Sequence, residues 1–141
     1  MVDYPVDFRT SSGARASEKT WSSKVSGESI KVSAPEEFGG EKQSASPEEL
    51  YTASLENCLL ATFKQIAERK GLEYEEISSE AVAELARNED SRPVMKKVRI
   101  EIEVEGIEDE DQASRVKKAA IRNCFIHRSV KTEVDQEFRW L

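Results

Sequence analysis

The chain contains two cysteines, Cys58 and Cys124, and a single histidine, His127. A thiol can act as a nucleophile, form a disulfide or bind a metal ion. A free cysteine most often behaves as a small buried hydrophobic residue, so residue type alone favours a structural role for both. Together with His127 they would supply only three metal ligands, whereas closed zinc sites have four. We therefore expect neither a metal ion nor a cofactor.

Cys58 lies inside the clearest predicted element, a helix over residues 47–70. Ser46, Pro47 and Glu49 form a capping box with proline at the first helical position, and Gly71 is suited to end the helix. Cys58 is about three turns inside this helix, beyond the reach of the helix dipole, so a thiolate there needs a cation from elsewhere in the fold. One apolar stripe runs along the helix through Tyr51, Leu55, Cys58, Leu59, Thr62, Phe63 and Ile66.

The other elements follow from hydrophobic periodicity. A second helix is predicted over 109–124, where Val116, Ala120 and Cys124 share one face. The order of strands and helices predicts an α+β fold with an antiparallel sheet, rather than a regular βαβ repeat. Strands are predicted over 3–10, 14–23, 29–34, 76–86, 98–104 and 130–140, and a loop over 34–45. The core is expected to include Phe8, Trp21, Phe138 and Trp140.

The composition limits the class of function. At 141 residues the chain is expected to form a single domain over 1–141. The net charge is −7, and the basic runs at 96–99 and 115–118 are short, so nucleic-acid binding is not expected. No apolar run approaches the ~20 residues of a membrane span. The start of the chain lacks the features of a signal peptide, so we expect a cytoplasmic protein without a persistent structural disulfide.

Two segments carry a resemblance to a known family. Residues 46–58, from Ser46-Pro47-Glu48-Glu49-Leu50 to Cys58, resemble the Pro-Glu-x-Leu…Cys helix start of the OsmC/Ohr family (osmotically inducible protein C and organic hydroperoxide resistance protein). Residues 123–130 resemble the second cysteine motif of that family, with Phe125 where the family often has proline. The resemblance extends from about residue 20 to the end of the chain.

This resemblance implies an OsmC-like fold in which two chains form an intertwined homodimer around their long central helices. It implies that Cys58 attacks an organic hydroperoxide, becomes a sulfenic acid and then forms a disulfide with Cys124. An external dithiol, in this family often a lipoyl group, reduces the pair. Glu48 matches the family's glutamate ten residues before Cys58. Ten helical residues span about 15 Å, so Glu48 would serve the site of the partner chain.

The family also uses an arginine beside the thiolate, and here the chain departs from the pattern. Organic hydroperoxide resistance proteins carry that arginine early, where this chain has residues 17–20 without one. OsmC-type proteins carry it in the loop before the long helix, where residues 36–38 are Glu-Glu-Phe. Arg15 is the first candidate for the role and Lys42 the second. The departure leaves open an alternative, an OsmC-like protein without peroxidase activity that binds a small apolar ligand at the dimer interface.

Overall fold

The computed structural model describes residues 1–141, which form two compact units, Met1–Leu50 and Tyr51–Leu141. The first unit holds a three-stranded antiparallel sheet in the order β1-β2-β3. Ser26 and Gly27 join β2 to β3, and both have positive φ angles, 50° and 80°. Two such residues form the tight turn whose twist suits a β-hairpin. The unit contains β1 (Thr10–Gly13), β2 (Thr20–Val25), β3 (Glu28–Ser33) and the short 3₁₀ helix η1 (Glu36–Phe38).

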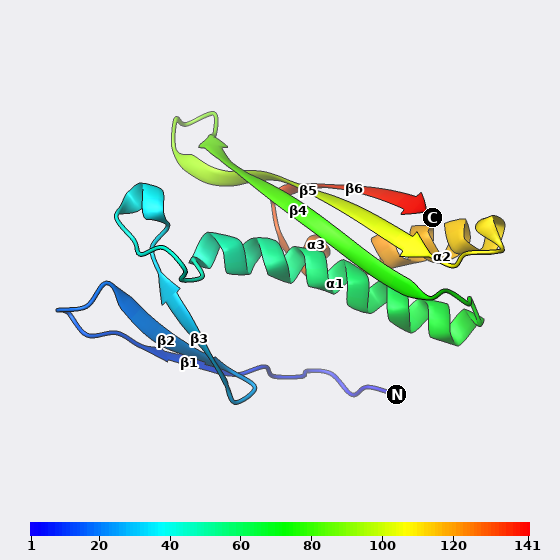
Figure 1. Ribbon diagram of the computed structural model, residues 1–141, viewed down its shortest axis with the longest axis horizontal. Helices are drawn as coiled ribbons and strands as arrows, with labels where there is room; N and C mark the ends of the chain where they lie inside the picture. The colour runs from blue at the N-terminus through cyan, green and yellow to red at the C-terminus, as the bar shows by residue number, and fades with distance from the viewer. The chain divides into compact units, whose positions relative to one another are not determined.

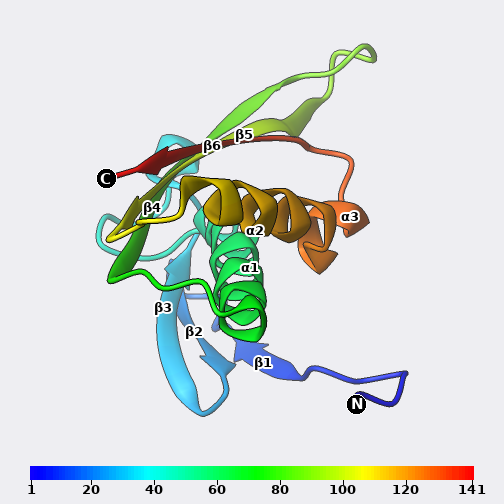
Figure 2. The same cartoon turned by 90° about the vertical axis from the view of Figure 1, so that its right-hand side faces the viewer.

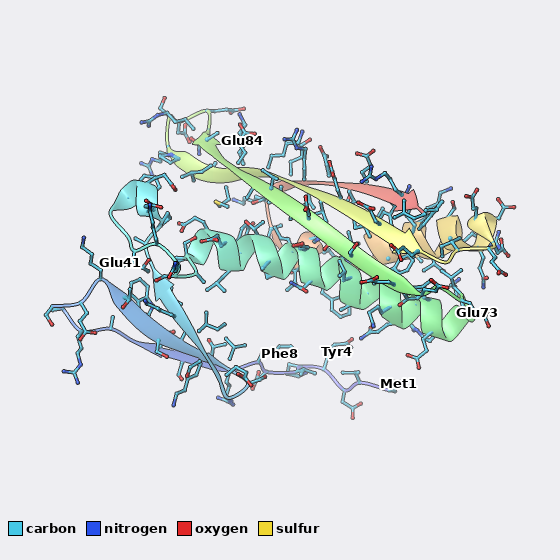
Figure 3. All side chains as sticks on the ribbon, viewed as in Figure 1. Met1, Tyr4, Phe8, Glu41, Glu73 and Glu84 are labelled. Carbon is cyan, nitrogen blue, oxygen red and sulfur yellow. The ribbon has the colours of Figure 1, made fainter.

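The predicted strand over 3–10 is wrong. Residues 1–9 form no helix or strand, and β1 begins only at Thr10. Tyr4, Val6 and Phe8 alternate as predicted, but their exposed fractions are 75%, 44% and 91%. Figure 3 shows Tyr4 and Phe8 on this extended segment. Alternation marks which side chains would share a face of a strand, but a strand also needs a hydrogen-bonded neighbour, which this segment lacks within the chain.

The long helix α1 (Pro47–Lys70) agrees with its prediction at both ends. At the start, the Glu49 backbone N–H donates to Ser46 Oγ at 3.1 Å, and the Ser46 N–H donates to Glu49 Oε1 at 3.1 Å. This reciprocal pair is the predicted capping box. At the end, Gly71 has a φ of 70° and the Leu72 N–H donates to the Ala67 carbonyl at 2.9 Å, which closes the last turn.

The second unit contains a sheet in the order β4-β5-β6, with α1 and α2 on one face (Figures 1 and 2). Strands β4 and β5 are antiparallel, whereas β5 and β6 are parallel. The sheet is therefore mixed, because a helix connects β5 to β6 and returns the chain to the end where β5 began. The elements are β4 (Glu76–Arg87), β5 (Pro93–Glu105), α2 (Glu110–Arg122), α3 (Phe125–Ser129) and β6 (Glu133–Trp140).

The core of this unit lies between the sheet and the two helices. Alternate residues of β5 point inward and are fully buried, while the other face carries charged side chains such as those of Lys97 and Glu103, which pair with Asp135 at 3.0 Å and Arg139 at 2.8 Å. Phe138 and Trp140 also pack against the core, as predicted. The buried apolar side chains are Leu55, Leu59, Phe63, Ile66, Ala67, Leu72, Val98, Ile100, Ile102, Val104, Ala113, Val116, Ala119 and Ala120.

Helix α2 confirms the predicted helix over 109–124 to within two residues at each end, but a separate helix, α3, follows it that the sequence pattern does not predict. Helix α2 ends at Arg122, and Cys124 has an extended backbone, with φ −78° and ψ 107°. Cys124 is thus the N-cap residue of α3, a five-residue helix that leads to β6. None of the helices is long and apolar enough to cross a lipid bilayer.

Candidate thiol site

Cys58 lies in the middle of α1, partly buried, where it packs against the core. Its neighbours on the helix, Leu55 and Leu59, are completely buried and fix the orientation of this face. One turn further along, the hydroxyl of Thr62 donates to the Cys58 carbonyl oxygen at 2.7 Å. Because α1 is long and anchored by this apolar face, the position of the Cys58 backbone is set by the helix.

Cys124 lies at the junction between α2 and α3, with a side chain that is 1% exposed. The Arg128 N–H donates to the Cys124 carbonyl at 3.1 Å and closes the turn of α3. Both cysteines are free thiols. The break in the helix therefore turns Cys124 into the core, instead of leaving it at a fraying helix end.

The two thiols, far apart in sequence, are neighbours in the second unit. The pKa of the Cys124 thiol is raised to about 12, mainly by burial and further by a hydrogen bond with the Cys58 side chain and by the negative charge of the Cys58 thiolate. The backbone N–H of His127 and the Thr62 hydroxyl act in the opposite direction by stabilising the thiolate. The fold thus brings Cys58 and Cys124 together and keeps Cys124 protonated at neutral pH.

His127 is built into the same site. Its Nε2 lies 2.7 Å from the Leu55 carbonyl oxygen, and its Nδ1 lies 3.2 Å from Nε2 of Gln136. Residue type alone suggests a metal ligand for His127 and a place in the apolar stripe of the helix for Thr62. The one signal in the sequence for a role beside the thiols is the position of His127 three residues after Cys124. No group of three or more His, Cys, Asp or Glu side chains is arranged to hold a metal ion.

The predicted activating groups lie in the first unit. Arg15 is exposed in the turn between β1 and β2, where its carbonyl accepts a hydrogen bond from the Glu18 N–H at 3.1 Å. Lys42 is also exposed, and its Nζ lies 3.6 Å from Glu36 Oε1. Glu48 is half-buried in the first turn of α1. The roles of these residues stay predictions. The groups that shift the pKa of Cys124 include no lysine or arginine.

The sequence was compared with protein families and with curated proteins. The family model described as OsmC-like protein matches residues 39–139. No curated protein is significantly similar to the sequence.

Several solved structures share the fold. An OsmC-like protein of unknown function from Vibrio cholerae is 22% identical, with a TM-score of 0.87, over 96% of this chain and 100% of that one. The organic hydroperoxide resistance protein OsmC from Legionella pneumophila is 16% identical, with a TM-score of 0.74, over 98% of each chain. An organic hydroperoxide resistance protein of Bacillus subtilis is 15% identical, with a TM-score of 0.69, over 96% of this chain and 98% of that one.

These likenesses confirm the α+β OsmC-like fold, and the family match covers most of the residues that hold the thiol site, including both cysteines. The chain belongs to the OsmC-like protein family.

Proposed function

We propose that this protein reduces organic hydroperoxides by a two-cysteine mechanism. The observation that carries the proposal is that Cys58 and Cys124 pack in the same core of one unit, with a hydrogen bond between their side chains. Both cysteines are free thiols, which is the form that would react with a peroxide. The names of the structural relatives from Legionella pneumophila and Bacillus subtilis, organic hydroperoxide resistance proteins, support the same activity.

The chemistry divides into three balanced steps. The Cys58 sulfur attacks one peroxide oxygen, the O–O bond breaks, and the substrate leaves as an alcohol, so that Cys58 becomes a sulfenic acid. The Cys124 thiol then loses its proton and its sulfur attacks the Cys58 sulfur, which forms the disulfide and releases water. An external dithiol finally exchanges with this disulfide, becomes oxidised itself and restores the two thiols.

The difference in burial supports the proposed roles of the two cysteines. Cys58 is the more accessible of the two, since it is partly exposed whereas Cys124 is 1% exposed. A peroxide from solution can therefore reach Cys58 first. Because Cys58 packs against an apolar core, an alkyl or fatty-acid peroxide would gain from the same surroundings, which favours it over hydrogen peroxide.

The proposal includes partners. An intertwined homodimer would cover the apolar side chains of Tyr4, Val6 and Phe8, which are exposed in the single chain. Glu48, and Arg15 or Lys42, would then contribute to the site as the family resemblance implies. The reductant would be a dithiol such as a lipoyl group. A protein in the cytoplasm would meet such a dithiol in its reduced form, because that compartment keeps thiols reduced.

Peroxide consumption by variants tests the proposal. Cys58→Ser is expected to abolish consumption of an alkyl hydroperoxide in the presence of a dithiol. Cys124→Ser is expected to retain one turnover, in which Cys58 is oxidised to a sulfenic acid that a dimedone-type reagent traps. A Cys58→Ser protein that consumes the peroxide as fast as the unmodified protein would exclude the mechanism.

A second function is favoured by one observation. Residues 17–20 and 36–38, where the family carries its activating arginine, contain none, whereas a peroxidatic thiolate is expected to have a cation nearby. An OsmC-like protein that binds a small apolar ligand at a dimer interface would need none. An apolar ligand that raises the melting temperature of the unmodified protein and of a variant lacking both cysteines by the same amount would support this alternative.

A further inference from the structure

The structure assigns His127 a positioning role. Cys124 and the five residues of α3 form a corner of the chain, which we call the α3 corner. The ring of His127 fixes this corner against helix α1, at the turn just before Cys58, and so sets how readily the two sulfurs form a bond. This role deepens the proposed peroxidase function, which it needs only for the identity of the oxidant. The geometry of the thiol pair, on which the role is based, comes from the structure alone.

The hydrogen bonds of the ring define its state. The Leu55 carbonyl can only accept, so Nε2 of His127, 2.7 Å away, must carry the proton. Nδ1 then has a free lone pair, and the side-chain amide of Gln136 donates to it at 3.2 Å. Both ring nitrogens are therefore satisfied with the proton on Nε2, and the two hydrogen bonds hold the ring in one orientation between α1 and β6.

The backbone of the same residue acts on the resolving thiol. The His127 N–H stabilises the thiolate form of Cys124, three residues earlier in the chain. The Leu55 carbonyl lies one turn before Cys58 on α1. One residue therefore links the two cysteines, through its ring on the side of Cys58 and through its backbone on the side of Cys124.

Few other contacts hold α3: the Arg128 guanidinium donates to the Arg122 carbonyl at 2.9 Å, and Val130, just after α3, packs against the core. None of the five residues of α3 is buried, and Phe125 and Ile126 are 65% and 39% exposed. The α3 corner is thus anchored by the buried Cys124 side chain and by the ring of His127. Without the ring, α3 and the Cys124 backbone should sample more conformations, because a segment with few buried contacts opens easily.

This freedom matters for one step only. A disulfide requires an S–S distance near 2.05 Å and Cα atoms within about 7 Å, so bond formation depends on how well the corner is positioned. The reaction of Cys58 with a peroxide does not involve Cys124 and should not depend on the ring. His127 therefore acts on disulfide formation and not on the first oxidation.

Equilibration with glutathione tests the positioning without any peroxide. The fraction of Cys58–Cys124 disulfide is measured in buffers of known reduced and oxidised glutathione, by alkylation of the remaining thiols and mass spectrometry. His127→Leu removes both ring hydrogen bonds and is expected to lower the equilibrium constant for the disulfide by about tenfold. His127→Gln keeps an N–H donor near the position of Nε2 and is expected to restore most of it.

A single-turnover experiment places the effect on the second step. After one equivalent of an alkyl hydroperoxide, His127→Leu should form the Cys58 sulfenic acid at the unmodified rate but close the disulfide about tenfold more slowly, so that more of it is trapped by dimedone. Gln136→Met removes only the donor to Nδ1, so it should lower the equilibrium constant and the rate of disulfide closure by less than His127→Leu does. This variant takes the place of His127→Leu if that protein does not fold.

The outcomes separate the two proposals. An equilibrium constant in glutathione that is the same for His127→Leu, His127→Gln and the unmodified, folded protein would overturn the positioning role. A second outcome is also informative: His127→Leu lowers the equilibrium constant for the disulfide in glutathione as expected, but the unmodified protein does not react with the hydroperoxide. This outcome would support the positioning role and contradict the peroxidase function.

Discussion

At the scale of single residues, the environment of Cys124 determines its chemistry. Burial and the neighbouring Cys58 side chain raise the pKa of Cys124 to about 12, from a reference value of 9.0. A thiol with such a pKa is a poor nucleophile toward a peroxide in water, because the thiolate is the reactive form. It can still attack a sulfenic acid held beside it, since proximity replaces much of the nucleophilicity that it lacks.

The raised pKa predicts a dependence of stability on pH. Between pH 9 and 12 the unfolded chain loses the Cys124 proton while the folded chain keeps it. The free energy of unfolding should therefore be unaffected by this group below about pH 9 and should fall above it, by up to about 1.4 kcal/mol per pH unit. Urea denaturation of the reduced protein at pH 8, 9 and 10 measures the effect.

The control for this measurement is Cys124→Ser, which does not titrate in this range. Lysines and tyrosines also titrate above pH 9, so the quantity of interest is the difference between the two proteins. We expect the unmodified protein to lose more stability than the serine variant as the pH rises. A difference that stays constant from pH 8 to pH 10 would show that Cys124 is not held protonated.

The types of the site residues could be found in the sequence, but most of their contacts could not. Cys58 and Cys124 were found because thiols are rare in this chain and lie in recognisable motifs. Thr62 and His127 were not recognised as part of the site, because their roles depend on the approach of α3 to α1, which is a tertiary contact. Residue type and spacing record such contacts only indirectly.

At the level of elements, local signals in the sequence predict both ends of α1 to the residue. The direction of β6 and the break after α2 depend instead on tertiary contacts. The capping box at Ser46 and the glycine after Lys70 mark the ends of α1 by local hydrogen bonding. The direction of β6 beside β5 was not predictable, because alternation gives the buried face of a strand but not the direction of its neighbour. The break at Cys124 was missed because the periodicity of α2 continues to it.

The capping box makes a prediction about stability. Ser46→Ala removes the acceptor for the Glu49 N–H and should lower the free energy of unfolding by about 1 kcal/mol. Ser46→Thr keeps a side-chain oxygen at the same position and should lower it by much less. Equilibrium denaturation in urea compares the three proteins, and an alanine variant as stable as the threonine variant would show that the cap does not stabilise α1.

At the scale of the whole molecule, the amino-terminal segment is the part of the chain least explained by its own contacts. Phe8 is 91% exposed and Tyr4 75% exposed, although both have large apolar side chains. The sequence alternation that predicted a strand there is real, and a second chain could supply the neighbour that the strand lacks. The proposed homodimer would give these side chains a place to be buried.

Removing one of these side chains should weaken association. Phe8→Ser is expected to raise the dissociation constant of the dimer by at least about tenfold, because each copy loses the burial of an aromatic ring. Val82→Ser is the matched control, since Val82 is 63% exposed on the outer face of β4 in the other unit. Sedimentation velocity over a range of concentrations measures both, and an equal effect of the two substitutions would argue against an interface at Phe8.

The central claim is that Cys58 and Cys124 act together as a redox pair. The most direct measurement treats the reduced protein with one equivalent of an alkyl hydroperoxide and maps the products by peptide mass spectrometry without reduction. We expect the loss of both free thiols and a single intramolecular disulfide between the peptides of Cys58 and Cys124. Two intact thiols after complete mixing, or oxidation of Cys58 that never yields this disulfide, would show that the two cysteines are not a redox pair.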